Sequence, residues 1–175
     1  MYRLRELERK DLSEINKWRN DVDIINCLGA PFRFINIEVD EKWFDAYMCS
    51  RNNCVRCAIV DELNDDIVGL VSLTNVDYIA RNAVFHIMIG RSENQGKGIG
   101  IFATNEMLGH AFKNMNLHRV ELEVLSDNER AIHMYKKIGF VEEGIKRQAV
   151  YKNGRYVDMK NFSMLEYEFE NFRAV

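Results

Sequence analysis

The N-terminal part of the chain begins with an alternating pattern and continues with two helical patterns. Apolar and polar side chains alternate over Tyr2–Leu7, which predicts an opening strand. The sequence Asp-Leu-Ser-Glu that begins at Asp11 has the form of a capping box and predicts a helix that continues through Trp18. Gly29-Ala30-Pro31 then breaks the chain, and Glu38–Met48 predicts a second helix. Its apolar stripe would comprise Val39, Trp43, Ala46 and Tyr47.

Apolar, β-branched runs dominate the next part of the chain. Val55–Val60 and Ile67–Val76 are two such runs, and the turn-forming sequence Asn64-Asp65-Asp66 separates them. Ala83–Ile89 predicts a further strand. Together with the opening strand, these runs predict an antiparallel meander.

Helical and strand patterns alternate in the second half of the chain. Ile99–Met115 predicts a helix, Arg119–Leu125 a strand, and Glu129–Ile138 another helix. Asn153-Gly154 marks the turn of a closing hairpin. A strand–helix–strand crossover makes its two strands parallel neighbours. The whole order predicts an α/β fold with a mixed central sheet, first an antiparallel meander and then the crossover, flanked by helices.

Length and composition limit the class of protein. The 175 residues contain one proline and no linker-like stretch, so we expect a single domain over residues 1–175. A net charge of -3 argues against a nucleic-acid partner. No apolar run approaches the roughly 20 residues that span a bilayer, and the first residues lack a signal-peptide pattern. We therefore expect a cytoplasmic protein with no membrane partner.

The chain has four cysteines, and two of them have a spacing with chemical alternatives. Cys54-x-x-Cys57 is typical of a redox pair or of half a zinc site. However, Cys57 leads directly into an apolar strand pattern, and no second pair completes a tetrahedral site. The sequence favours structural thiols and no metal.

A glycine-rich segment between a strand and a helix, Gly90–Gly100, carries the strongest chemical signal. Glycines at alternate positions allow a ligand to approach the backbone closely. The first amides of a helix lack intrahelical acceptors and face the positive end of the helix dipole. A pyrophosphate is the natural ligand for such a site.

Three interpretations of this segment compete with the family resemblance described next. It does not fit a P-loop, because no Gly-Lys-Ser/Thr sequence ends it. The stretch Gly98–Ala103 matches the dinucleotide pattern G-x-G-x-x-A, with Glu121 and Glu123 about 20 residues further on. That match is weak, since the segment follows a meander and only one strand–helix unit comes after it. A tight turn without a ligand also stays open.

Two motifs together resemble the GNAT superfamily of N-acetyltransferases. Gln95–Gly100 resembles its Q/R-x-x-G-x-G/A motif, and Asn128–Phe140 resembles its N-x-x-A-x-x-x-Y-x-x-x-G-F segment. The closing Tyr151–Asp158 and the earlier elements also fit, so the resemblance spans nearly the whole chain. It looks closest to the branch of ribosomal-protein N-terminal, spermidine and amino-sugar acetyltransferases.

The resemblance implies acetyl-CoA as co-substrate and assigns residues to it. Backbone amides of the glycine segment would hold the pyrophosphate, and the end of the preceding strand would pair with the pantetheine arm. The side-chain amide of Asn128 would form a hydrogen bond with the pantetheine arm. Lys136 or Lys137 would approach the phosphates, although both lysines equally suit a solvated helix face. The implied cofactor-binding residues are Met88, Ile89, Gly90, Gln95, Gly96, Lys97, Gly98, Ile99, Gly100, Asn128 and Lys137.

The implied catalytic residues are Tyr135, His86 and Glu123. Tyr135 corresponds to the tyrosine that protonates the leaving sulfur, although its apolar neighbours on the helix also suit a core residue. Many relatives carry a glutamate base where this chain has Val84. His86 would share a strand face with Val84 and titrates near neutral pH. The alternative for His86 is a packed, hydrogen-bonded residue without a catalytic role. Glu123 and Glu121 form a second candidate pair, which could relay a proton, bind a cationic acceptor or simply face solvent.

The resemblance implies that acetyl is transferred directly to the primary amine of a small molecule such as a polyamine or an amino sugar. Acetylation of a protein N-terminus is one alternative, and a non-catalytic CoA-binding regulatory domain is another. Members of the family are often dimers, so a homodimer is left open. A polyamine site would need clustered acids, for which the candidates are Asp21, Asp23, Glu38, Asp40 and Glu41.

Overall fold

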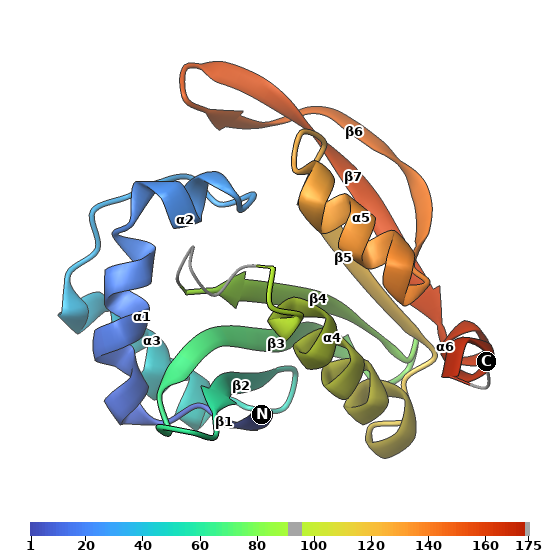
Figure 1. Cartoon of the computed structure of the whole chain (residues 1–175), viewed down its shortest axis with the longest axis horizontal. Helices are drawn as coiled ribbons and strands as arrows, with labels where there is room; N and C mark the ends of the chain where they lie inside the picture. Colours follow the sequence, from blue (N-terminus) through green and yellow to red (C-terminus); the bar gives the residue numbers. More distant parts are fainter. Residues whose placement is uncertain (91–95, 174–175) are drawn as a thin grey trace.

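The computed structural model describes residues 1–90 and 96–173. Within them, one sheet has the strand order β1-β2-β3-β4-β5-β7-β6 (Figure 1). The strands are β1 (Tyr2–Glu6), β2 (Val55–Asp61), β3 (Ile67–Asp77), β4 (Asn82–Ile89), β5 (Arg119–Leu125), β6 (Val141–Lys152) and β7 (Arg155–Leu165). The helices are α1 (Leu12–Arg19), α2 (Val22–Asn26), α3 (Ile37–Cys49), α4 (Ile99–Gly109), α5 (Glu129–Ile138) and α6 (Glu166–Arg173).

The predicted mixed sheet is confirmed. Strands β1 to β4 pair antiparallel in sequence order, which is the expected meander. Helix α4 then carries the chain to β5, which pairs parallel with β4. The closing strands β6 and β7 form an antiparallel hairpin, and β7 pairs antiparallel with β5.

Helices cover the two faces of the sheet differently. Helices α4 and α5 pack on one face, where residues such as Ala103 and Ile138 join Leu73 and Phe85 of the strands in the main core. Helices α1 to α3 cover the other face over the meander, and Met88 of β4 packs against their cluster. Figure 1 shows the hairpin of β6 and β7 on the opposite side of the molecule from α1 and α3.

Local predictions fail where a distant side chain decides burial. On α3, Val39 is 51% exposed, whereas Asp40, Phe44 and Tyr47 form the buried face, so the predicted stripe is shifted. Asp40 is buried because its carboxylate forms an ion pair with Arg19 of α1. Helices α2 and α6 were not predicted, and the expected helix over Ile99–Met115 is α4 followed by a π-helical turn over His110–Asn114.

The predicted capping box at Asp11 is wrong. The Asp11 carboxylate does not cap α1. It accepts hydrogen bonds from both terminal nitrogens of Arg5, at 2.7 and 2.8 Å, and from the amide of Glu8 at 2.8 Å. Asp11 therefore closes the 3-10 turn Arg9–Asp11, and Arg5 of β1 neutralises its buried charge.

The four cysteines are free thiols. Burial raises the pKa of Cys57 to about 11, so its thiol is protonated at neutral pH. Among residues 1–90 and 96–173, no three His, Cys, Asp or Glu side chains gather as metal ligands would. No helix in the same residues has the length and apolar character needed to cross a membrane.

Candidate active site

Strands β4 and β5 separate shortly after they meet. They pair only from Asn82 with Arg119 to Val84 with Glu121. Figure 1 shows the two strands diverging beyond this point, with α5 beside β5. Past Val84, the edge of β4 that faces β5 has no strand partner among the described residues, so its backbone groups can bind an extended ligand.

The register identifies which backbone groups face this opening. The amide of Gly90 donates to Val68 of β3 at 2.8 Å. In an antiparallel pair, the backbone groups of successive residues point alternately toward the partner strand and away from it. Ile89 therefore presents its amide and carbonyl to the β5 side, whereas Met88 and Gly90 bond toward β3. Of the three predicted residues at this strand end, Ile89 has the geometry to pair with a pantetheine arm.

Tyr135 of α5 lies over the point where the strands separate. Its ring packs edge-to-face against Phe85, with centroids 6.5 Å apart, and against Phe140, with centroids 5.6 Å apart. Phe85 is the first β4 residue beyond the pairing with β5. The side chain of Tyr135 is 6% exposed, and burial raises the pKa of its phenol above the usual value. The hydroxyl is thus protonated at neutral pH, as a proton donor requires.

His86 lies on the opposite face of β4 from Phe85, because successive strand residues alternate in direction. Its Nε2 lies 2.9 Å from Oγ1 of Thr74 on β3. The ring keeps contact with solvent, but burial among protein atoms lowers its pKa, and nearby Arg56 lowers it further. The charge of Glu123 partly opposes this shift. The imidazole is therefore neutral at pH 7 and can accept a proton.

The β5 carboxylates on this face have basic neighbours. Glu123 forms an ion pair with Lys146 of β6. Glu121 lies 3.0 Å from Arg119, which also binds Glu143 through both terminal nitrogens. Glu121 and Glu123 are both exposed. They form an acidic but internally paired surface beside the opening, and the catalytic role of Glu123 stays a prediction.

The glycine segment that leads into α4 has two positions with left-handed backbone. Gly96 has φ 82° and Gly98 has φ 80°, a region that favours glycine. A Cβ added at either position would meet no atom of the described residues within 4 Å, so these residues leave open space beside the backbone. Lys97 between them is exposed. These features fit a backbone cradle for phosphates at the start of α4, and the predicted Gln95 lies outside the described residues.

Ile99 and Gly100 are positioned by the core as well as by the predicted ligand. The Ile99 side chain is 1% exposed and belongs to the main core, so only its backbone can contact a phosphate. A Cβ on Gly100 would lie 2.7 Å from Sδ of Met134 on α5. The missing side chain of Gly100 therefore allows α4 and α5 to pack closely, a role that the sequence did not indicate.

Asn128, at the start of α5, and Lys136 have partners within the protein. The Asn128 side chain caps α5 by accepting from the amide of Ala131 at 3.1 Å, and it donates to the carbonyl of Cys27 at 3.0 Å. Lys136 forms an ion pair with Glu142 at 3.0 Å, and Lys137 is exposed. The cofactor contacts of Asn128 and Lys137 stay predictions.

The acids considered for a polyamine site do not form one open cluster. Asp40 is completely buried and paired with Arg19. Asp21 caps α2 by accepting from the amides of Asp23 and Ile24. The remaining acids of the set are exposed. Asp40 is therefore a structural residue.

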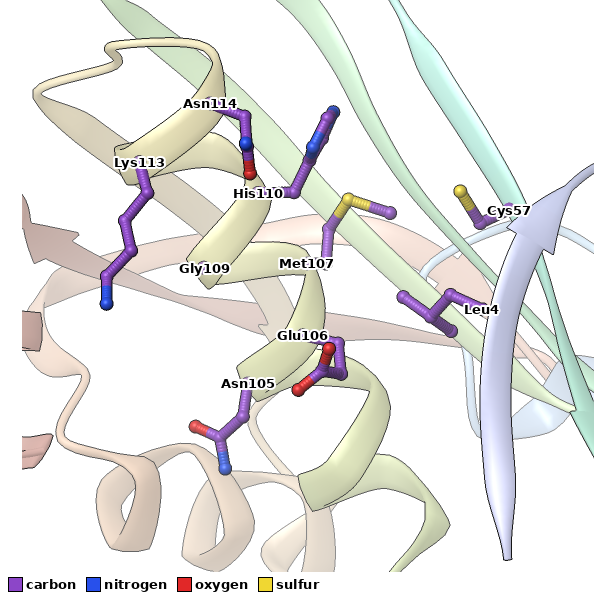
Figure 2. Close-up of a pocket in the computed structure, with 9 residues that line it drawn as sticks. All are labelled: Leu4, Cys57, Asn105, Glu106, Met107, Gly109, His110, Lys113 and Asn114. Carbon is purple, nitrogen blue, oxygen red and sulfur yellow. The ribbon is translucent and has the colours of Figure 1, made fainter.

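A pocket of about 410 Å³ lies between α4, with the π-helical turn that follows it, and the edge strand β1 with its neighbour β2. Figure 2 shows Leu4 and Cys57 on one side of it, facing Met107 and His110 on the other. None of its lining residues belongs to the predicted site. It is a separate surface depression.

Arg56 and Thr74 are polar neighbours of His86 that sequence reasoning missed. Arg56 pairs with Ser72 across β2 and β3, and Ser72 pairs with His86 across β3 and β4, so the three residues form one row. Only the strand register brings these residues together, and that register depends on how three separate segments of the sequence align.

The chain is similar to a known domain family and to enzymes named for spermidine. The model of the acetyltransferase (GNAT) domain matches residues 4–160. Spermidine N(1)-acetyltransferase of Vibrio cholerae is 34% identical over 169 residues, which cover 96% of this chain and 95% of that protein. The Escherichia coli K12 enzyme of the same name is 28% identical, over 95% of this chain and 87% of its own length.

A partial relative and a solved structure are also similar to this chain. The putative ribosomal N-acetyltransferase YdaF of Bacillus subtilis is 35% identical, but over 59% of this chain and 56% of its own length. The crystal structure of spermidine N-acetyltransferase from V. cholerae in complex with CoA and spermine superposes with a TM-score of 0.90. It is 33% identical and covers 97% of this chain and 98% of that chain.

Proposed function

The chain belongs to the GNAT acetyltransferase family and is an N-acetyltransferase that uses acetyl-CoA, and we propose that its acceptor is a polyamine of the spermidine class. The observation that carries the proposal is the similarity, from end to end, to enzymes named for spermidine. The relative whose structure holds CoA and spermine also shares the arrangement of the whole chain.

The exposed surface beside the opening supports a cationic acceptor. Glu121 and Glu123 project from β5 on the face that also carries His86. A polyamine carries several ammonium groups, and carboxylates favour them over neutral amines. Lys146 and Arg119, which pair with these carboxylates, are side chains that an acceptor ammonium would displace.

The reaction first requires that the acceptor amine lose a proton. An alkyl amine has a pKa near 10.4, so the neutral form costs about 4.6 kcal/mol at pH 7. We propose His86 as the base that takes this proton, directly or through water, because its lowered pKa keeps the ring neutral. Glu123 is the alternative base, and its ion pair with Lys146 makes it the weaker candidate.

Protonation of the leaving sulfur is the second requirement. Acetyl-CoA, when bound, supplies an activated acetyl group as a thioester. We propose that the Tyr135 hydroxyl donates a proton as the thiol leaves, since burial raises its pKa and keeps it protonated. We propose further that the amides at Gly96–Gly100 bind the phosphates and that Ile89 pairs with the arm. Asn128 and Lys137 would add side-chain contacts.

An acceptor panel tests the proposal. Purified protein is given acetyl-CoA with spermidine, spermine, an amino sugar or a short peptide, and CoA release is measured. We expect turnover with the polyamines. Turnover of the peptide alone would favour the alternative function, acetylation of a protein N-terminus. The partial similarity to a putative ribosomal N-acetyltransferase is the reason to include this alternative. CoA binding without turnover of any amine would favour a regulatory domain.

Two further expectations belong to the proposal and stay predictions. One is a location in the cytoplasm. The other is a homodimer, which analytical ultracentrifugation of the full chain would test.

A further inference from the structure

Trp18 is a buried side chain that the proposed reaction does not yet use. It lies in the last turn of α1, and its side chain is 2% exposed. It belongs to the cluster that includes Leu12 and Ile15, against which Met88 of β4 packs. Figure 1 shows α1 beside the end of β4. The indole thus contacts the strand end that leads into the glycine segment.

Gly90 provides the space for this ring. A Cβ on Gly90 would lie 2.0 Å from Cε2 of Trp18 and 2.2 Å from Cζ2, so no other residue fits there without moving the indole. The closest atom, Cε2, is bonded to Nε1. The indole nitrogen therefore lies beside the backbone of Gly90, next to Ile89, whose backbone groups face the opening.

The indole nitrogen has no hydrogen-bond acceptor among residues 1–90 and 96–173. Nε1 of Trp18 is buried, and no atom in that part of the chain accepts its hydrogen. Buried donors are almost always paired in folded proteins, and an unpaired one costs about 1–3 kcal/mol. A donor kept unpaired at the end of β4 points to a ligand atom that completes it.

We propose that Nε1 of Trp18 donates a hydrogen bond to an oxygen of the bound acetyl-CoA, from its pantetheine arm or its phosphates. This inference rests on the proposed function, because it assumes that the cofactor runs along the open edge of β4. Ammonium groups have no lone pair to accept with. A polyamine in its protonated form therefore cannot satisfy the indole, whereas the amide and phosphate oxygens of the cofactor can.

The first test observes the donor directly by ¹H–¹⁵N NMR of the full chain. The protein has two tryptophans, so two indole signals are expected, and Trp18→Phe assigns them. Titration with CoA should move the Trp18 signal downfield, as a new hydrogen bond does, and leave the signal of Trp43 nearly unchanged. An unmoved Trp18 signal at saturating CoA overturns the inference. A shift caused by spermidine but not by CoA also overturns it.

The second test measures affinity without any turnover. Trp18→Phe should weaken CoA binding in calorimetry by about tenfold, and Trp43→Phe serves as the matched control with unchanged affinity. Because Phe is smaller than Trp, 3-benzothienylalanine at position 18 provides a second variant with a sulfur in place of the N–H group and nearly the same shape. Wild-type affinity in this second variant overturns the inference.

The two failures are distinguishable. If the wild-type protein itself binds no CoA, the cofactor assignment fails and the inference fails with it. If the wild-type protein binds CoA and acetylates spermidine, and both variants at position 18 bind CoA as tightly as the wild type, the inference alone fails.

Discussion

Replacing Tyr135 with Phe removes one hydroxyl and keeps one ring. The phenyl ring retains its packing against Phe85, Phe140 and Phe162, whose centroids lie 6.5, 5.6 and 6.3 Å from that of Tyr135. The variant should therefore fold and bind CoA like the wild type. What it loses is the proposed proton donor for the leaving sulfur.

The size of the loss follows from the role. A positioned general acid contributes about 10²- to 10⁴-fold to a rate, which corresponds to about 3–5 kcal/mol in the barrier. We expect kcat to fall by that factor at saturating acetyl-CoA and spermidine, measured as release of the CoA thiol. Because burial raises the pKa of Tyr135 above its usual value, the wild-type rate should show no loss from ionisation of this group between pH 7 and about 9.

Tyr47→Phe is the matched control. Its hydroxyl donates to Glu6 at 2.9 Å on the side of the sheet covered by α3, away from the opening between β4 and β5. This variant should lose about 1 kcal/mol of unfolding free energy and keep its kcat. If Tyr135→Phe keeps kcat within about twofold of the wild type, Tyr135 is not the acid. If its CoA affinity falls together with kcat, the hydroxyl acts in binding.

Three other changes test the site and its supports. In His86→Gln, kcat/KM should fall and lose its acid limb. The wild-type rate should decline as pH drops through the lowered pKa of His86, because protonation removes the base. A wild-type profile without an acid limb, or a His86→Gln profile that keeps it, would contradict this. Gly90→Ala should destabilise the protein by about 1–3 kcal/mol in denaturant unfolding, because the added methyl overlaps the Trp18 ring. The same substitution should cost less in a Trp18→Leu background, where the smaller side chain leaves room for the methyl, and an equal cost in both backgrounds would show that the ring is not the obstacle. Lys152→Met should lower the unfolding free energy by about 1–3 kcal/mol, because its buried ammonium donates to the carbonyls of Ile25, Leu28 and Ala30, and an unchanged value would show that water replaces it.

Local signals were sufficient for most of the fold. Strand β5 and helix α5 have the predicted bounds, Arg119–Leu125 and Glu129–Ile138. Helix α5 begins at the cap provided by Asn128 and ends at Gly139, which adopts φ 102°. Caps, glycines and periodicity act over a few residues, so a single sequence displays them in full.

Predictions failed where partners lie far apart along the chain. Asp11 was assigned to the start of α1, but Arg5 of β1 binds its carboxylate instead. Asp40 was a candidate acid for a polyamine site, but it is buried and paired with Arg19 and Asn16. An analysis of hydrophobic periodicity assigns every aspartate to the polar surface. Only the tertiary structure shows which aspartates have a basic partner that permits burial.

The candidate site was also predictable only in part. The sequence identified the types of residue, such as the phenol of Tyr135 and the glycines before α4. It did not show that Thr74 and Arg56 flank His86, or that Trp18 occupies the space beside Gly90. These juxtapositions depend on strand register and on the packing of α1 against β4, neither of which leaves a local pattern.

The separation of β4 from β5 explains how the proposed acid and base can act in the same acetyl transfer, the base on the acceptor amine and the acid on the leaving sulfur. Tyr135 reaches the strands from the face covered by α5, through contact with Phe85. His86 is the next residue of β4 and therefore points to the opposite face. A continuous sheet would keep the two groups apart, whereas the opening beyond Val84 lets both approach a thioester lying between the strands. A one-residue slip of β4 would exchange the faces of Phe85 and His86, so the buried alternation of β4, which fixes that register, is also what the proposed chemistry depends on.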